Sequence, residues 1–90
     1  MEKFVVKHLI SYQKGTSDKV WGYVAIGRGG YVFWGKREKG RFQTQACDGF
    51  DADNRASLKR NEGYRNCPQH DIPDFQNRMQ DAVFLKAILA

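Results

Sequence analysis

Residues 19–34 read KVWGYVAIGRGGYVFW, two apolar and aromatic runs separated by four residues of which three are glycine. Valine, isoleucine and the aromatic residues are enriched in strands. Glycine adopts the positive φ angles of a tight turn without steric cost. The stretch therefore predicts a β-hairpin with a turn at 27–30. A phosphate-binding loop is not expected there, because no Gly-Lys-Ser/Thr follows and no helix begins at that point.

Alternating segments on both sides of this hairpin predict two further strands. Upstream, residues 4–11 follow a two-residue period that sets Phe4, Val6, His8 and Ile10 against Val5, Lys7, Leu9 and Ser11. A polar, glycine-containing turn at 13–18 ends that strand. Downstream, residues 41–47 predict a strand with Phe42, Thr44 and Ala46 on one face. Together these segments predict a twisted antiparallel sheet of about four strands.

Two helices are expected after the strands, which makes the fold class α+β. Asp51 and Asp53 are suitable N-caps for a short helix that runs to residue 62 and ends at Gly63. A second helix is predicted from Pro73 onward, with Asp74 at its positive dipole end. Its apolar side recurs at helical spacing and comprises Phe75, Met79, Ala82, Val83, Ile88 and Leu89, with the stem of Lys86 as a further candidate.

Composition describes a single basic domain over residues 1–90. The 15 lysines and arginines exceed the 10 acids and give a formal charge of +5. Such a charge favours a polyanionic partner, although many small soluble proteins are mildly basic. We expect a soluble, cytoplasmic protein, because no apolar run approaches ~20 residues and no secretory signal is evident. Cys47 and Cys67 are too few for a disulfide framework and are expected to be free thiols, with a bridge between them as the alternative.

Several short segments follow one another in an order that extends over residues 3–66. They are Thr16-Ser17-Asp18-Lys19 before Val20-Trp21, the glycine hairpin, Phe33-Trp34-Gly35-Lys36, Lys39-Gly40-Arg41-Phe42-Gln43, and Glu62-Gly63-Tyr64. In this order the chain resembles the WGR domain, a small β-rich module of DNA-damage-responsive poly(ADP-ribose) polymerases and of bacterial proteins. The resemblance implies a WGR-like fold, with Trp34-Gly35-Lys36 at the Trp-Gly-Arg motif.

The chain departs from the family in three respects. Lys36 replaces the motif arginine, which keeps the charge but loses the planar guanidinium, although Arg37 follows directly. The helix expected at 53–62 is shorter than that of the family. Residues 73–90, the additional C-terminal helix, have no counterpart in it.

The resemblance implies a non-catalytic nucleic-acid-binding module. Trp34 is expected to stack on an exposed nucleotide while the neighbouring turn binds phosphates, and Trp21 is expected in the core. The predicted binding residues are Trp34, Lys36, Arg37, Lys39 and Arg41, with Arg28 of the hairpin widening the patch. DNA is favoured over RNA, without base-sequence specificity.

Two purely structural alternatives stay open. Trp34 could be a core residue that caps the sheet, and the charged turn could be a solvated loop without a binding role. Lys59 and Arg60 are assigned to the dipole at a helix end rather than to the patch.

Other functions are less well supported by the residues. A protein–protein interaction adaptor using the same surface, or the C-terminal helix as a dimerisation element, is the main alternative. Polymerase activity is not expected, because in the family it belongs to a separate, larger domain. Asp48, Asp51 and Asp53 suit a nuclease metal site only remotely, since N-capping explains them. The set Cys47, Cys67, His70 and Asp71 lacks regular metal-ligand spacing. We therefore expect no enzyme activity, no metal and no cofactor.

Overall fold

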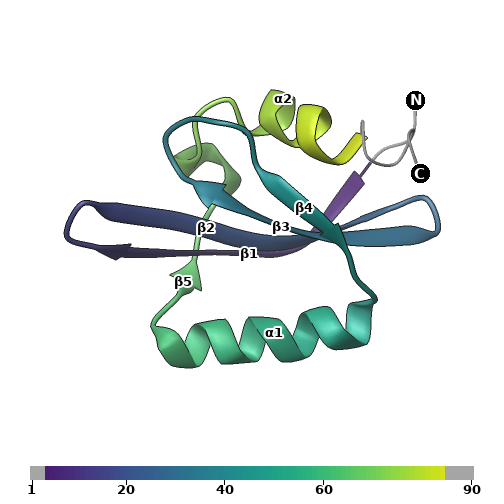
Figure 1. The fold of residues 1–90 in the computed structure, drawn as a ribbon, viewed down its shortest axis with the longest axis horizontal. Coiled ribbons are helices and arrows are strands. Elements are labelled where there is room, and N and C mark those ends of the chain that lie inside the picture. Colours follow the sequence, from purple (N-terminus) through teal and green to yellow (C-terminus); the bar gives the residue numbers. More distant parts are fainter. Residues whose placement is uncertain (1–3, 85–90) are drawn as a thin grey trace.

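The computed structural model describes residues 4–84, and at its centre lies an open antiparallel sheet of five strands (Figure 1). The strands are β1 (Phe4–Lys14), β2 (Ser17–Ile26), β3 (Gly29–Lys36), β4 (Gln43–Ala46) and β5 (Arg65–Asn66). Their order across the sheet is β4-β3-β2-β1-β5. The predicted meander of β1 to β4 is therefore present, and the two-residue strand β5 adds an edge that the sequence pattern did not predict.

Helices cover both faces of the sheet, so the described chain has three layers (Figure 1). Helix α1 (Gly49–Glu62) lies on one face, and α2 (Phe75–Met79), which continues as a π-helical turn η2 (Gln80–Phe84), lies on the other. A short 3-10 turn, η1 (Gln69–Asp71), precedes α2. Each face has its own apolar cluster: Trp21, Tyr23 and Val32 pack with α1, whereas Val24 and Phe33 pack with α2. The α+β class expected from the sequence is confirmed.

The first strand contains a bulge that changes which side chains share a face. The β1–β2 register shifts between Val6 and His8. Because a bulge adds one residue to one strand, side chains beyond it point to the opposite face. Phe4, Val6 and Leu9 consequently pack with the α2-side cluster, whereas Ile10 lies in the α1-side cluster. The prediction that Phe4, Val6 and Ile10 share one face is wrong for this reason.

Helix α1 begins earlier than the sequence indicated. Asp48 is its N-cap, and the Asp48 carboxylate accepts a 2.7 Å hydrogen bond from the backbone N–H of Asp51. The choice of Asp51 or Asp53 as N-cap is thus corrected, and the helix has 14 residues. Its predicted end is confirmed, since Gly63 has a φ of 117° and donates its backbone N–H to the Arg60 carbonyl.

The second helix begins later than predicted, at Phe75. Asp74 stands outside it in the left-handed region, with a φ of 55°, and its carboxylate accepts a 2.8 Å hydrogen bond from the Asn77 side chain. Phe75, Met79 and Ala82 are buried against the sheet, as their spacing predicted. Residues 85–90, including the predicted apolar positions Ile88 and Leu89, lie outside the described part of the chain.

The two cysteines are free, as expected, and they lie in different layers. Cys47 packs beside the α1-side cluster and Cys67 belongs to the α2-side cluster, so the sheet separates their sulfur atoms. Within residues 4–84, none of the helices has both the length and the apolar character needed to cross a membrane.

Candidate nucleic-acid interface

A groove of about 610 Å³ opens between α1 and the sheet, and Trp34 is part of its lining. We refer to it as the Trp34 groove. Strands β2 and β3 provide one wall and α1 with the following tyrosine provides the other. The lining residues are Lys19, Val20, Trp21, Val32, Trp34, Gly35, Lys36, Gln45, Arg55, Leu58, Lys59, Glu62 and Tyr64. The lining thus combines aromatic and aliphatic side chains with four cations and a single acid.

Two cross-strand pairs define the sheet wall of the groove. Trp21 lies directly opposite Trp34, and Lys19 lies directly opposite Lys36. Side chains two residues apart on a strand point to the same face, so both pairs face α1. Trp21 is only 4% exposed and completes the core as predicted, whereas Trp34 is partly exposed beside it. The sheet therefore presents the Trp34 ring, followed along the strands by two ammonium groups.

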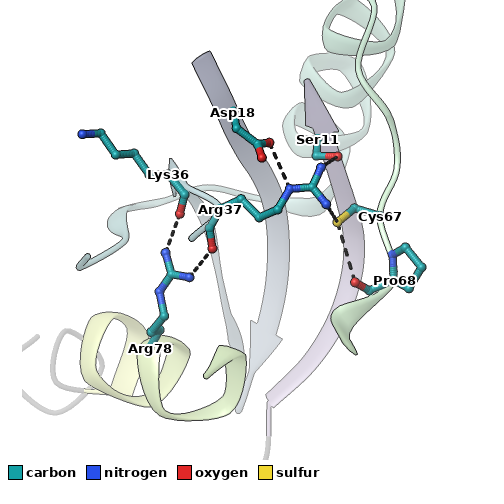
Figure 2. A network of polar contacts seen from close by, with 7 residues as sticks. All are labelled: Ser11, Asp18, Lys36, Arg37, Cys67, Pro68 and Arg78. Carbon is teal, nitrogen blue, oxygen red and sulfur yellow. Dashed lines mark hydrogen bonds and ion pairs between the residues drawn. The ribbon is translucent and has the colours of Figure 1, made fainter. Parts of the chain in front are cut away.

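The lysine pair has no acidic partner in the described part of the chain. All ion pairs found within residues 4–84 involve other residues. Figure 2 shows the Lys36 side chain extending away from the neighbouring polar network, to which it contributes only its backbone carbonyl. Like charges directly opposite each other destabilise a sheet. An anion bound between Lys19 and Lys36 would relieve that repulsion.

The α1 wall adds an apolar side chain and two further cations. Leu58 is 64% exposed at the groove. Arg55 forms a 3.1 Å ion pair with Asp51, one turn earlier on the helix. The Lys59 ammonium lies 5.2 Å from the centre of the Tyr64 ring. Lys59 therefore remains at the groove while its charge contacts an aromatic face.

Arg37 does not join Trp34, although the sequence suggested that it would. Its guanidinium points to the opposite side of β3, where Nε donates to Asp18 at 2.9 Å and an Nη donates to the Ser11 hydroxyl at 2.9 Å (Figure 2). The second Nη lies 3.8 Å from the Cys67 sulfur. The hydrogen bond to Asp18 raises the pKa of Arg37. Its charge is thus used to link β2, β1 and the segment after β5.

The remaining turn cations are held on the α2 side of the sheet. Residues 37–42, which we call the cationic loop, rise on that side between β3 and β4 (Figure 1). Buried Arg78 of α2 donates hydrogen bonds to the carbonyls of Lys36, Arg37 and Gly40 (Figure 2 draws the first two). Its guanidinium also lies 4.2 Å from the centre of the Phe42 ring. Burial lowers the pKa of Arg78, yet a guanidinium stays charged in proteins.

The predicted ring of turn cations around Trp34 is consequently not formed. Lys39 and Arg41 are exposed on the cationic loop and do not line the Trp34 groove. Of the four predicted turn cations, only Lys36 shares the groove with Trp34. The physical reason is strand alternation together with the path of the chain. The Lys36 side chain points to the α1 face, and the backbone after it turns toward α2, where Phe42 packs in the core.

Arg28 is also separated from the groove. It lies in the β2–β3 turn next to the Ile26–Gly29 pair, whereas the Lys19–Lys36 pair closes the other end of the same two strands. Seven residues of strand correspond to roughly 23 Å. Arg28 therefore lies at the far end of the hairpin and does not widen the patch.

The motif glycine has a structural explanation. A Cβ atom at Gly35 would lie 2.9 Å from the Cδ1 atom of Phe42. Gly35 faces the α2 side, so its role is to let the Phe42 ring pack against β3. In the sequence Trp34-Gly35-Lys36, the partly exposed Trp34 ring and the Lys36 ammonium thus lie on one face of β3. Gly35 contacts the core on the other face.

Sequence reasoning missed the residues that complete the groove. The sequence contains a signal for Lys19. It stands two residues before Trp21, so the two side chains point to the same face of the strand. Arg55, Leu58, Lys59 and Glu62 follow the three- and four-residue spacing of one helix face. That face could be found from the sequence, but its position opposite Trp34 depends on how α1 packs.

Groups suited to catalysis or metal binding are sparse. His8 forms a 2.6 Å contact with the Asp53 carboxylate, which links β1 to α1 on the surface. Within residues 4–84, no three side chains of histidine, cysteine, aspartate or glutamate come close enough to hold a metal ion. The Cys47 thiol, close to the Asp51 carboxylate, has a pKa raised mainly by burial.

Comparison of the chain with protein-family models, with curated proteins and with solved structures finds no match. The grounds for a function are therefore the residues of the groove and their chemistry.

Proposed function

We propose that this chain is a non-catalytic nucleic-acid-binding module that binds DNA in the Trp34 groove. The observation that carries the proposal is the order of two cross-strand pairs on one face, Trp21–Trp34 followed by Lys19–Lys36. Aromatic rings stack on bases or sugars, and nearby ammonium groups bind the phosphates of the same strand. The chain's charge of +5 adds long-range attraction to any polyanion.

The resemblance to the WGR domain supports the same proposal. In that family the motif tryptophan is implicated in packing at a DNA end, and Trp34 stands at the matching place in this chain. The 53–62 helix expected from the sequence was shorter than that of the family. Helix α1 has 14 residues, which reduces this difference. Lys36 in place of the motif arginine is compatible with phosphate binding as a point charge, although not with bidentate contact.

The proposal is tested by titrating fluorescently labelled single-stranded, duplex and nicked DNA at several salt concentrations and following anisotropy. We expect the logarithm of the affinity to fall linearly with the logarithm of the salt concentration, because phosphate binding releases counterions. Binding should also weaken in Trp34→Ala and in Lys36→Glu. Absence of salt-sensitive binding to every oligonucleotide would overturn the proposal.

A second candidate function, protein–protein interaction, is favoured by a separate observation. Phe50 on the first turn of α1 is 81% exposed and does not line the Trp34 groove. An exposed phenylalanine offers a large apolar side chain that a protein partner could bury. Under this function, the chain should self-associate through Phe50. Sedimentation of the wild type and of Phe50→Asp separates the two functions, since only the interaction function requires Phe50.

A further inference from the structure

We propose that the Trp34 groove takes one unpaired nucleotide, so that the module recognises single-stranded or bulged DNA in preference to intact duplex. This inference rests on the proposed function and specifies its substrate class. Three observations support it: the position of Trp34 in the groove, the presence of Leu58 in the lining of the same groove, and the arrangement of the cations that could bind phosphate.

Trp34 lies in a concave site rather than on an open surface. The ring is partly buried, and α1 forms a second wall opposite the sheet. Bases in a duplex are stacked and paired, so a ring held between a helix and a sheet cannot reach them. An unpaired base can leave the stack and enter such a site, at a cost that is smallest where no partner base is present. The volume of about 610 Å³ lies within the range of small-molecule sites.

Leu58 provides the second face for the base. Its side chain is 64% exposed, although it lines the same groove as Trp34. A planar ring bound there would contact an aromatic face on the sheet side and an aliphatic side chain on the helix side. The Gln45 amide and the Glu62 carboxylate, both in the lining, offer hydrogen-bonding groups to the polar edge of a base.

The charges fit one strand of DNA. Lys19 and Lys36 lie next to the tryptophan pair on the same face, at a separation of about 6.6 Å along the strands. They are therefore placed for the phosphate next to the bound base. On the helix wall, Arg55 is paired with Asp51, the Lys59 ammonium lies over the Tyr64 ring, and Glu62 is an acid. That wall is less suited to the phosphates of a second strand.

The inference is tested with three DNA probes of matched sequence, namely a blunt G·C-rich duplex, the same duplex with one bulged nucleotide, and the single strand. We expect the bulged duplex and the single strand to bind about tenfold or more tightly than the blunt duplex at the same salt concentration. Leu58→Ala should remove most of that preference. The matched control is Val5→Ala, which shortens another exposed apolar side chain, on β1 and outside the groove, and should keep the preference.

Two outcomes separate this inference from the proposed function. Salt-sensitive binding with equal affinity for the blunt and the bulged duplex would overturn the inference and leave the proposed function in place. Absence of salt-sensitive binding to all three probes and to nicked DNA would overturn both. Leu58 is largely solvent-exposed, so its truncation leaves the core intact and the comparison does not depend on a destabilised variant.

Discussion

Trp34 and Lys36 lie two residues apart on β3, and this spacing puts an aromatic ring and an ammonium group on the same face of the sheet. Each has an equivalent residue directly opposite on β2. Residue-scale reasoning from the sequence identified Trp34 and Lys36 correctly as neighbours. It also grouped Arg37 with them, but strand alternation turns the Arg37 side chain to the other face, where Asp18 binds it.

Truncation of the accessible tryptophan is the first prediction at this scale. Trp34→Ala should lower the affinity for single-stranded DNA by ~1–3 kcal/mol, the usual contribution of base stacking. This corresponds to a change of about 5- to 150-fold in the dissociation constant. Trp34→Phe keeps an aromatic face and should recover part of the loss. Anisotropy titrations check both variants, and unchanged binding by Trp34→Ala would contradict the stacking role.

Removal of one groove lysine should have opposite effects on stability and binding. Lys19→Gln relieves the like-charge pair with Lys36, so the free energy of unfolding should rise by ~0.2–1 kcal/mol. The same change removes a phosphate contact, and the salt dependence of single-strand binding should become shallower by about 0.7. Urea denaturation and salt-titrated anisotropy measure the two quantities.

The matched control for this prediction is Arg28→Gln. It removes one positive charge from the same hairpin, at the end that is roughly 23 Å from the groove. Its effect on affinity should be smaller than that of Lys19→Gln. If Arg28→Gln weakened binding more strongly, the interface would lie at the other end of the sheet.

At the scale of elements, α2 orders the cationic loop through a single buried side chain. Arg78 is 8% exposed and donates to the carbonyls of Lys36, Arg37 and Gly40, and to that of Pro73 at 3.2 Å. These bonds leave the side chains of Lys39 and Arg41 exposed. The loop is consequently a fixed feature of the surface that contributes charge without lining the groove.

Replacement of this arginine should destabilise the domain. Arg78→Met removes a charged donor that binds four backbone carbonyls, and hydrogen bonds to a charged group contribute ~1.5–3 kcal/mol each. We expect a decrease in the free energy of unfolding of at least that amount, measured by urea denaturation. Arg60→Met, on the exposed end of α1, is the control and should change stability by less than ~1 kcal/mol. Equal stability of the two variants would show that the Arg78 contacts are not needed.

The elements also differ in how far the sequence predicts them. The 19–34 hairpin and the Gly63 helix end are local features, since glycine positions and apolar runs specify them. The bulge near Lys7 depends on how β1 pairs with β2, and the start of α1 at Gly49 follows from the use of Asp48 as its cap. No local signal distinguishes Asp48 from the later aspartates as the N-cap, because all three are suitable capping residues.

At the scale of the whole molecule, two small apolar clusters on opposite faces share one sheet. The sequence predicted the sheet and both helices, but not which helix covers which face. Trp34 therefore could not be placed opposite α1, and Lys19, Leu58 and Lys59 were missed as its neighbours. Charges that are adjacent in the sequence do not predict a shared surface patch, because adjacent residues of a strand point to opposite faces.

The titration of buried groups predicts a loss of stability at alkaline pH. Burial raises the pKa of Tyr23 and Tyr64 above the ordinary value of 10.0, and that of Cys47 above 9.0. The folded state then binds these protons more tightly than the unfolded state does. The corresponding stability is fully present below about pH 9 and falls as the pH rises through the raised values.

Urea denaturation at pH 7.5, 9 and 10.5 measures this dependence. The free energy of unfolding should decrease mainly between the last two values. Tyr64→Phe removes one of the titrating groups and should lose less stability over that interval than the wild type. An equally steep loss in Tyr64→Phe would show that Tyr64 does not contribute.

The central claim is that nucleic acid binds in the Trp34 groove, and an NMR titration with a short single-stranded DNA tests it most directly. The indole N–H of Trp34 and the backbone amides of Lys19, Lys36 and Leu58 should show the largest chemical-shift changes. The amides around Arg28, at the other end of the hairpin, should barely move. Saturable binding with the largest changes around Arg28 or on α2, and an unchanged Trp34 indole, would contradict the claim.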